Sequence, residues 1–163
     1  MTDPSPFVPD DFTIPAPLAS DGWRLEPLGP DYNDADYAAW TSSIEFIRGL
    51  PGFAEWDWPP DEMSLDDNRN DMVMHLGEYE RREAFAYTVL EGTGDDEDVV
   101  GCLYINPVNI EKRPYQAGHD VQVRSWVRAD RPGLDRDLWA AVSDWLTEAW
   151  PFTNPRYHPR SPG

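Results

Sequence analysis

The stretch that decides the fold is HDVQVRSWVRADRPGLDRDLWAAVSDWLTEAW, which runs from His119 to Trp150. In its first part Val121, Val123, Ser125 and Val127 share one face, and the opposite face carries Gln122, Arg124, Trp126 and Arg128. This period of two predicts a strand with one buried face. After Pro132 and Gly133 the apolar residues take helical spacing, which predicts a helix from about Asp135 to just before Pro151. A strand, a tight turn and a helix direct backbone N–H groups above the helix N-terminus, so the turn is a candidate anion or phosphate site.

Composition excludes several classes of function. The 163 residues suffice for one domain with a sizeable core, and 31 acidic against 13 basic residues give a net charge of −18. Such a charge repels nucleic acids and anionic membranes, so we expect neither as a partner. The single cysteine, Cys102, cannot form an internal disulfide. No stretch has the pattern of a signal peptide or a membrane span, and we expect a cytoplasmic protein.

The first half of the chain predicts one strand and three helices. The strand is Trp23–Leu28, and a helix capped by Asp31 or Asn33 follows it to about Trp40. A short helical turn lies within SSIEFIRGL. Ser64 opens the longest helix, with Asp67 in the position of a capping-box acid. This helix has an apolar stripe of Leu65, Met72, Leu76 and Tyr79 and, beside it, a polar row of Asn68, Asp71, His75 and Glu78.

Two further strands, Phe85–Leu90 and Val99–Ile105, are separated by an acidic turn with glycine and predict an antiparallel hairpin. The chain therefore reads as an α+β domain at residues 21–150. Residues 1–20 are rich in proline and predict an extended, loosely packed arm. Residues 151–163 form a tail that supplies at most a short extended piece.

This order of elements resembles the GNAT superfamily of N-acetyltransferases over residues 21–150. The segments that carry the resemblance are WRLEPL, DADYAAW, SSIEFIRGL, FAYTVL, VVGCLYINP, VQVRSWV and the helix from Leu134. It implies a mixed, mainly antiparallel sheet flanked by helices. It also leads us to expect that the fold is truncated after its third main helix, with no helix to carry the family's thiolate-protonating tyrosine.

The resemblance implies acetyl-CoA as cosubstrate. In the family the fourth strand offers backbone groups to the pantetheine arm, and a (Q/R)-x-x-G-x-(G/A) loop binds the pyrophosphate. The candidate cofactor-binding residues here are Trp126, Val127, Arg128, Arg131, Gly133 and Arg136. The loop departs from the motif, because Pro132 stands at its first position and Asp135 and Asp137 stand where small residues belong. The alternative is an ordinary strand-to-helix turn in which Asp135 caps the helix.

Acetyl transfer also needs a proton acceptor and a proton donor near the reacting atoms. The candidate catalytic residues are Asp120 beside His119 at the start of the fourth strand, Tyr104 in the third strand, and His75. His75 and Asp71 are neighbours on one helix face and could form a hydrogen-bonded pair. No metal is expected, because the three histidines and one cysteine match no metal-site spacing.

Two functions follow. The first is an N-acetyltransferase that acts on a small-molecule or peptide amine, since an acidic surface suits a cationic acceptor. The second is a GNAT-fold binding or interaction module without catalysis, which the altered loop and the truncation favour. The truncation would also leave an unpaired sheet edge beside the fourth strand, so we expect a homodimer or the N-terminal arm to cover that edge.

Overall fold

The protein is built on a six-stranded sheet with the order β1–β2–β3–β4–β5–β6, and side chains pack on both of its faces. The computed structural model describes residues 6–160. The strands are β1 (Ala19–Ser20), β2 (Trp23–Pro27), β3 (Phe85–Glu91), β4 (Asp98–Asn106), β5 (Val121–Val127) and β6 (Pro155–Arg156). All neighbouring pairs are antiparallel except β5 and β6, which run parallel. The predicted hairpin of β3 and β4 is confirmed.

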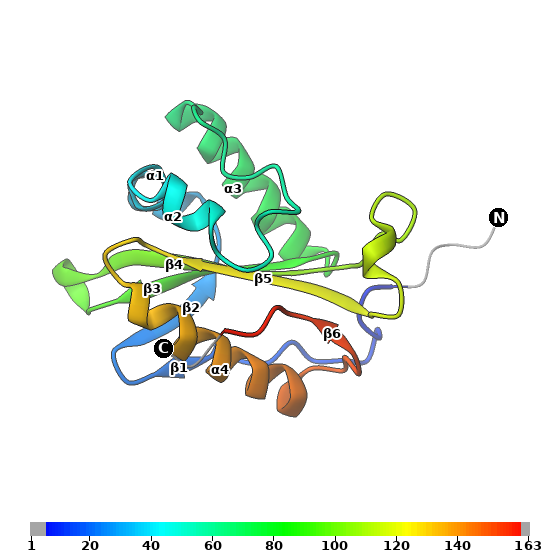
Figure 1. Ribbon diagram of the computed structural model, residues 1–163. Coiled ribbons are helices and arrows are strands. Elements are labelled where there is room, and N and C mark those ends of the chain that lie inside the picture. Colours follow the sequence, from blue (N-terminus) through cyan, green and yellow to red (C-terminus); the bar gives the residue numbers. More distant parts are fainter. Residues whose placement is uncertain (1–5, 161–163) are drawn as a thin grey trace.

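Helices cover both faces of this sheet (Figure 1). One face carries α1 (Asn33–Thr41), α2 (Ile44–Arg48) and α3 (Leu65–Glu80), and the other carries α4 (Pro132–Ala149). Short 3-10 turns occur at Pro30–Tyr32, Gly94–Asp96 and Pro114–Gln116. Within residues 6–160 no helix is both long and apolar enough to span a membrane.

Helix ends follow the sequence signals in part. The Ser64 hydroxyl accepts the Asp67 N–H at 3.0 Å, so the predicted cap of α3 is confirmed. The predicted cap of α1 is wrong, because the N-cap is Tyr32 and no side chain bonds the free amides there. α4 begins at Pro132, three residues before the predicted start, since proline fits the first turn of a helix without losing a hydrogen bond.

β5 is buried on both faces, and the prediction of one buried face is wrong. Val121, Val123 and Val127 pack in the core under α4. On the other face, the loop between α2 and α3 covers Arg124, which is only 3% exposed and whose Nε–H donates to the Gly52 carbonyl of that loop at 3.0 Å. The polar face of β5 is therefore buried and not exposed to solvent, because the loop between α2 and α3 supplies hydrogen-bond acceptors for its side chains.

α3 turns part of its polar row toward the sheet. Asn68 and Met72 are its buried residues, whereas Leu65 of the predicted apolar stripe is 41% exposed. The Asn68 amide accepts the Trp40 indole N–H at 2.8 Å and donates to Asp36 Oδ2 at 3.1 Å. These bonds join α1 to α3, so a polar residue sets the rotation of the helix.

The N-terminal arm is packed rather than loose in its described part, residues 6–20. Val8 is 1% exposed, and the Phe7 ring lies 5.9 Å from Phe85 and 5.2 Å from Phe152. Arg82 donates to the Pro9 and Phe12 carbonyls at 2.8 and 2.6 Å. The first five residues of the predicted arm lie outside the described part. The described part of the arm therefore adds to the core on the α4 side, and the edge of β5 that we expected the arm to cover pairs with β6.

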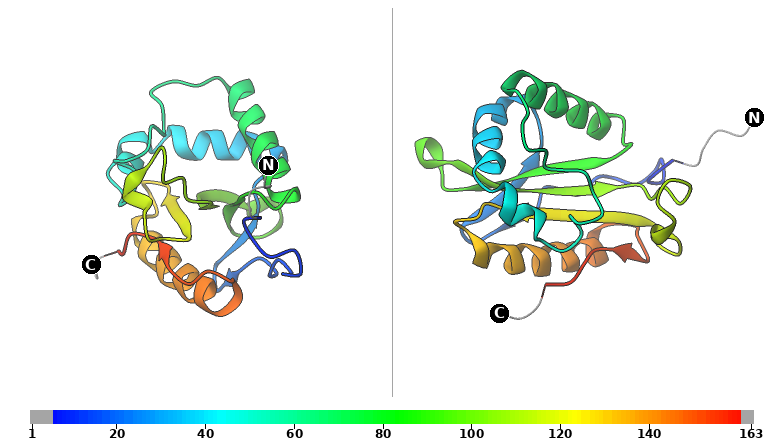
Figure 2. Two further views of the ribbon diagram at one scale, coloured as in Figure 1. Left: turned by 90° about the vertical axis from the view of Figure 1, so that its right-hand side faces the viewer. Right: turned by 45° about the horizontal axis from the view of Figure 1, so that its top comes forward.

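The edge of β5 is covered instead by the chain that follows α4 (Figure 2). α4 crosses the sheet and returns the chain as β6, which pairs with β5 only at Val121–Pro155 and Gln122–Arg156. The tail thus supplies the short extended piece that was predicted. The same chain therefore covers this part of the edge, and the homodimer stays a prediction.

Candidate functional site

The candidate site is the edge of β5 between β6 and the start of α4. After Arg156 the backbone of the following chain no longer pairs with β5, and side chains bridge the gap. The Tyr157 hydroxyl lies 2.6 Å from the Ser125 hydroxyl, and Arg160 Nη2 donates to the Ser125 carbonyl at 2.9 Å. Burial raises the pKa of Tyr157, so its hydroxyl keeps its proton. The space along this half of β5 is therefore filled by residues 157–160.

Arg160 and Asp135 form a buried ion pair at the inner end of this space. Arg160 is 6% exposed and Asp135 is 8% exposed. Nε and Nη2 of the guanidinium donate to the two carboxylate oxygens at 2.8 and 3.2 Å, and Nη1 donates to the His158 carbonyl at 2.9 Å. The alternative in which Asp135 caps α4 is wrong. The N-cap residue is Arg131, no side-chain hydrogen bond caps this helix, and the Asp135 carboxylate instead pairs with Arg160.

A second ion pair holds the other end of the same segment. Glu55, in the loop between α2 and α3, accepts from both terminal nitrogens of Arg156 at 2.6 and 2.7 Å. His158 Nε2 lies 3.8 Å from the same carboxylate. The hydrogen bonds from Arg156, more than any other contact, lower the pKa of Glu55, so this carboxyl group stays ionised. Residues 155–160 are therefore fixed to the loop at one end and to α4 at the other.

The predicted cofactor-binding residues divide into two groups. Trp126 and Val127 are buried in β5, and the Trp126 indole donates to the Tyr104 hydroxyl at 3.1 Å. Arg128 pairs with Asp98 at 2.7 Å and Asp130 at 2.8 Å, and Arg131 pairs with Glu91 at 2.9 Å. Hydrogen bonding to Asp130 is the main cause that raises the pKa of Arg128. These two arginines are engaged with carboxylates of the same chain.

Gly133 and Arg136 lie together at the first turn of α4, where they line a hollow of about 430 Å³. Pro51 and Arg160 form its other walls, and Asp135 and Asp137 also border it. Gly133 has open space where a Cβ would lie, and Arg136 is exposed. Backbone N–H groups at the helix N-terminus and the Arg136 guanidinium favour binding of an anion in this hollow. The carboxylates of Asp135 and Asp137 weaken that binding.

The predicted catalytic residues lie in two places. Tyr104 and His75 meet on the α1–α3 face of the sheet, with ring centroids 5.9 Å apart. Tyr104 is 5% exposed, and burial raises the pKa of its hydroxyl. Burial lowers the pKa of His75 to about 4, so its imidazole is neutral at physiological pH. The nearest carboxylate to His75 is Glu78 at 3.5 Å, where Asp71 was expected.

Asp120 lies at the start of β5, away from this pair. Its carboxylate accepts the backbone N–H groups of Thr153 and Asn154 at 2.7 and 2.9 Å. It therefore fixes the turn between α4 and β6.

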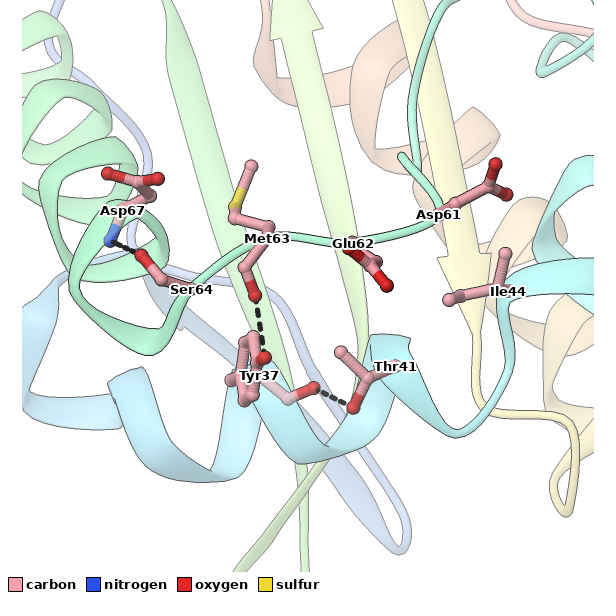
Figure 3. A pocket seen from close by; sticks show the side chains of 8 residues that line it. All are labelled: Tyr37, Thr41, Ile44, Asp61, Glu62, Met63, Ser64 and Asp67. Carbon is pink, nitrogen blue, oxygen red and sulfur yellow. Dashed lines mark hydrogen bonds between the residues drawn. The ribbon is translucent and has the colours of Figure 1, made fainter.

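A second and larger hollow, of about 680 Å³, opens between α1 and the loop that leads into α3 (Figure 3). Asp61, Glu62 and Asp67 border it, and the Tyr37 hydroxyl donates to the Met63 carbonyl at 2.6 Å. Three carboxylates give this surface a negative potential.

The residues that the sequence analysis missed are Ser125, Tyr157 and Arg160, together with Glu55 and Arg156. One signal was present, because RYHPR at 156–160 concentrates basic groups in a chain of net charge −18. Such a cluster predicts contacts with carboxylates of the same chain. It does not say which carboxylates, since the partners lie 25 and 101 positions away.

Comparisons with known proteins agree at the level of the fold. No family model matches the chain, and no curated protein matches it by sequence. Solved structures do match. The ribosomal-protein-S5-alanine acetyltransferase of Vibrio fischeri superposes on 83% of this chain and 69% of its own, with a TM-score of 0.58 and 10% identity.

Two further structures contain the coenzyme. The microcin C7 self-immunity acetyltransferase MccE, solved with acetyl-CoA and AMP, matches 79% of this chain and 63% of its own, with a TM-score of 0.58 and 15% identity. RimL, the ribosomal L7/L12 α-N-protein acetyltransferase, solved with coenzyme A, matches 78% of this chain and 65% of its own, with a TM-score of 0.55 and 13% identity. This chain therefore spans less than two thirds of the length of these two proteins. It has the fold of the GNAT-type acetyltransferases that its sequence resembles.

Proposed function

We propose that this protein is an N-acetyltransferase that transfers the acetyl group of acetyl-CoA to an amine. The observation that carries the proposal is the exposed start of α4 beside β5, where Gly133 and Arg136 border an open hollow in a GNAT-type fold. The fold alone supports an acyltransferase only by analogy. The hollow adds a place with helix N–H groups and a cation for a diphosphate.

Residues at the start of α4 and along β5 are suited to hold the diphosphate and the arm of the coenzyme. Gly133 and Arg136 would hold its diphosphate, and backbone groups of Trp126, Val127 and Arg128 would hold its arm. Arg131 would add positive charge near the same turn once it leaves Glu91. When bound, acetyl-CoA supplies an activated thioester. The arm does not fit while Tyr157 and Arg160 engage Ser125, so binding requires that residues 157–160 move.

The proton-transfer roles remain proposals. Tyr104 keeps its proton across the physiological range, because burial raises its pKa, and it could protonate a leaving thiolate. His75 is neutral, and its low pKa makes it a weak base. Asp120 is assigned to the positioning of the turn at Thr153 rather than to proton abstraction.

The acceptor is proposed to be a small-molecule or peptide amine. The ribosomal-protein acetyltransferases that share the fold are named for modification of protein amines. The net charge of −18 and the acidic hollow beside α1 would attract a cationic acceptor. A cytoplasmic location and a homodimer remain predictions.

The first test is calorimetric titration of the full chain with coenzyme A and acetyl-CoA, followed by thiol release with peptides that carry a free amine. We expect binding, and Arg136→Glu should weaken it at least tenfold, because the change puts a carboxylate beside the diphosphate. Arg81→Glu, on an exposed surface pair with Glu83, is the matched charge control and should change binding less than twofold. Absence of binding at millimolar coenzyme A would rule out the proposed acetyltransferase function.

The two loop acids are expected to behave differently. Asp137→Ala should raise affinity for coenzyme A up to about fivefold, since one exposed like charge costs about 1 kcal/mol at close range. Asp135→Gly should lower the free energy of unfolding instead, because Arg160 would lose its buried partner. Titration and chemical denaturation of both variants measure these effects. Equal gains in affinity without any loss of stability would contradict the assigned ion pair.

The alternative is a binding module without catalysis. The occupation of the Ser125 carbonyl by Arg160 favours it. Tight coenzyme binding with no thiol release across a panel of amines would support this alternative over the enzyme.

A further inference from the structure

Residues 155–160 cross the same stretch of β5 that the coenzyme arm would use. The Ser125 carbonyl is bonded by Arg160, and the Val123 carbonyl is bonded by the Gln122 amide at 3.2 Å, which also donates to the Arg156 carbonyl. Backbone acceptors on the outer edge of β5 are thus satisfied within the chain. A ligand that lies along this edge has to replace at least the bond from Arg160.

Ion pairs at the two ends hold this segment, and between them the Tyr157 ring packs against the core on the α4 side. The first latch is Glu55 with Arg156, and the second is Asp135 with Arg160. The Tyr157–Ser125 hydrogen bond and the hydrogen bonds between Gln122 and Arg156 also join the segment to β5. All four charged groups would regain water if the segment moved away. Opening therefore replaces two ion pairs by hydrated charges, and it exposes one aromatic side chain rather than a whole strand of apolar core.

We propose that residues 155–160 form a strap that competes with the coenzyme arm for the outer edge of β5, held closed by the Glu55–Arg156 and Asp135–Arg160 latches. The inference rests on the proposed function. When only a fraction of the molecules is in the binding-competent state, the apparent affinity for the ligand is reduced by that fraction. The strap sets the affinity for the coenzyme without touching the acceptor side.

The strap has a further consequence for charge. In the closed state Arg160 neutralises Asp135, the acid that otherwise faces the hollow at α4. Opening of the second latch exposes that carboxylate beside the diphosphate position. A test of the second latch must therefore remove the Asp135 charge together with Arg160, so that no carboxylate is left beside the diphosphate position.

The test uses calorimetric titration of the full chain with coenzyme A in wild type and in two latch variants. Glu55→Gln removes the charge of the first latch and keeps a side-chain oxygen near the buried Arg124 guanidinium, which lies 4.0 Å from Glu55. Asp135→Asn with Arg160→Gln opens the second latch and removes both charges together. We expect affinity to rise about tenfold in each. Asp137→Asn removes one acid from the same hollow without touching a latch, and it should account for no more than about fivefold.

Amide exchange of the peptide that covers residues 153–160 separates the possible outcomes. The strap predicts that coenzyme A speeds exchange there in wild type and that both latch variants exchange fast without coenzyme. Equal affinities of wild type and Glu55→Gln, with exchange unchanged by coenzyme, would overturn the strap and leave the proposed function intact. Fast exchange in the variants without any coenzyme binding would overturn the proposed function and the competition together.

Discussion

Asp36 is a carboxyl group with almost no contact with water, at 6% exposure between α1 and β4. Its oxygens accept the Asn68 amide at 3.1 Å and the Cys102 thiol at 3.4 Å. Burial outweighs these bonds and raises the pKa of Asp36 from 3.8 to about 6. The group is therefore neutral in mildly acidic solution and charged at physiological pH. No sequence pattern marked it, because an acid in the first turn of a helix is ordinary.

We predict from this pKa a stability that depends on pH. A raised folded-state pKa contributes stability that is full below about pH 4 and is lost as pH rises through about 6. The loss is at most about 3 kcal/mol. Asp36→Asn removes it, so the free energy of unfolding of the variant minus that of wild type should increase between pH 4 and pH 7.5. Denaturant titrations at both pH values measure the difference, and a constant difference would contradict the raised pKa.

At the scale of elements, hydrogen bonds between side chains decide how the helices dock. The indole N–H of Trp40 and the amide of Asn68 form a buried bond between α1 and α3, and Asn33 accepts the same amide at 2.8 Å. A docking interface built on polar groups is more sensitive to substitution than an apolar one, since each lost partner strands a buried donor or acceptor.

Asn68→Ala should therefore lower the free energy of unfolding by about 2–4 kcal/mol, because it strands the Trp40 indole and leaves a small cavity. Asn70, two positions further along α3 and exposed, is the matched control. Asn70→Ala should change stability by less than about 0.5 kcal/mol. Urea denaturation of both variants checks this, and equal costs at the two positions would show that α3 docks with a different face.

At the scale of the whole molecule, charge and topology act together. The net charge of −18 opposes compaction through self-repulsion, which salt reduces. Ion pairs oppose this trend, and several of them join distant parts of the chain, among them the two latches on residues 155–160 and the pair of Arg24 with Glu97. Topology closes the sheet on the β5 side without a partner molecule, because α4 brings β6 back in parallel.

Salt should thus stabilise the protein. An increase from 20 to 200 mM NaCl is expected to raise the melting temperature by about 2–4 °C, which corresponds to about 1 kcal/mol for a chain of this size. Calorimetry at constant pH measures the shift. A fall in melting temperature would mean that the ion pairs, and not the self-repulsion, dominate the electrostatic free energy.

The sequence by itself determined the order of the main helices and strands, the β3–β4 hairpin, the Ser64 cap and the strand–turn–helix unit at β5 and α4, but not the short strand β1 within the predicted arm. Periodicity, turn residues and caps act over a few positions, so they can be read locally. Only the tertiary structure decided that β5 is buried on both faces, that Asn68 turns inward, and that Arg160 pairs with Asp135. These outcomes depend on contacts between segments that are far apart in the sequence, and periodicity, turn residues and caps carry no information about such contacts.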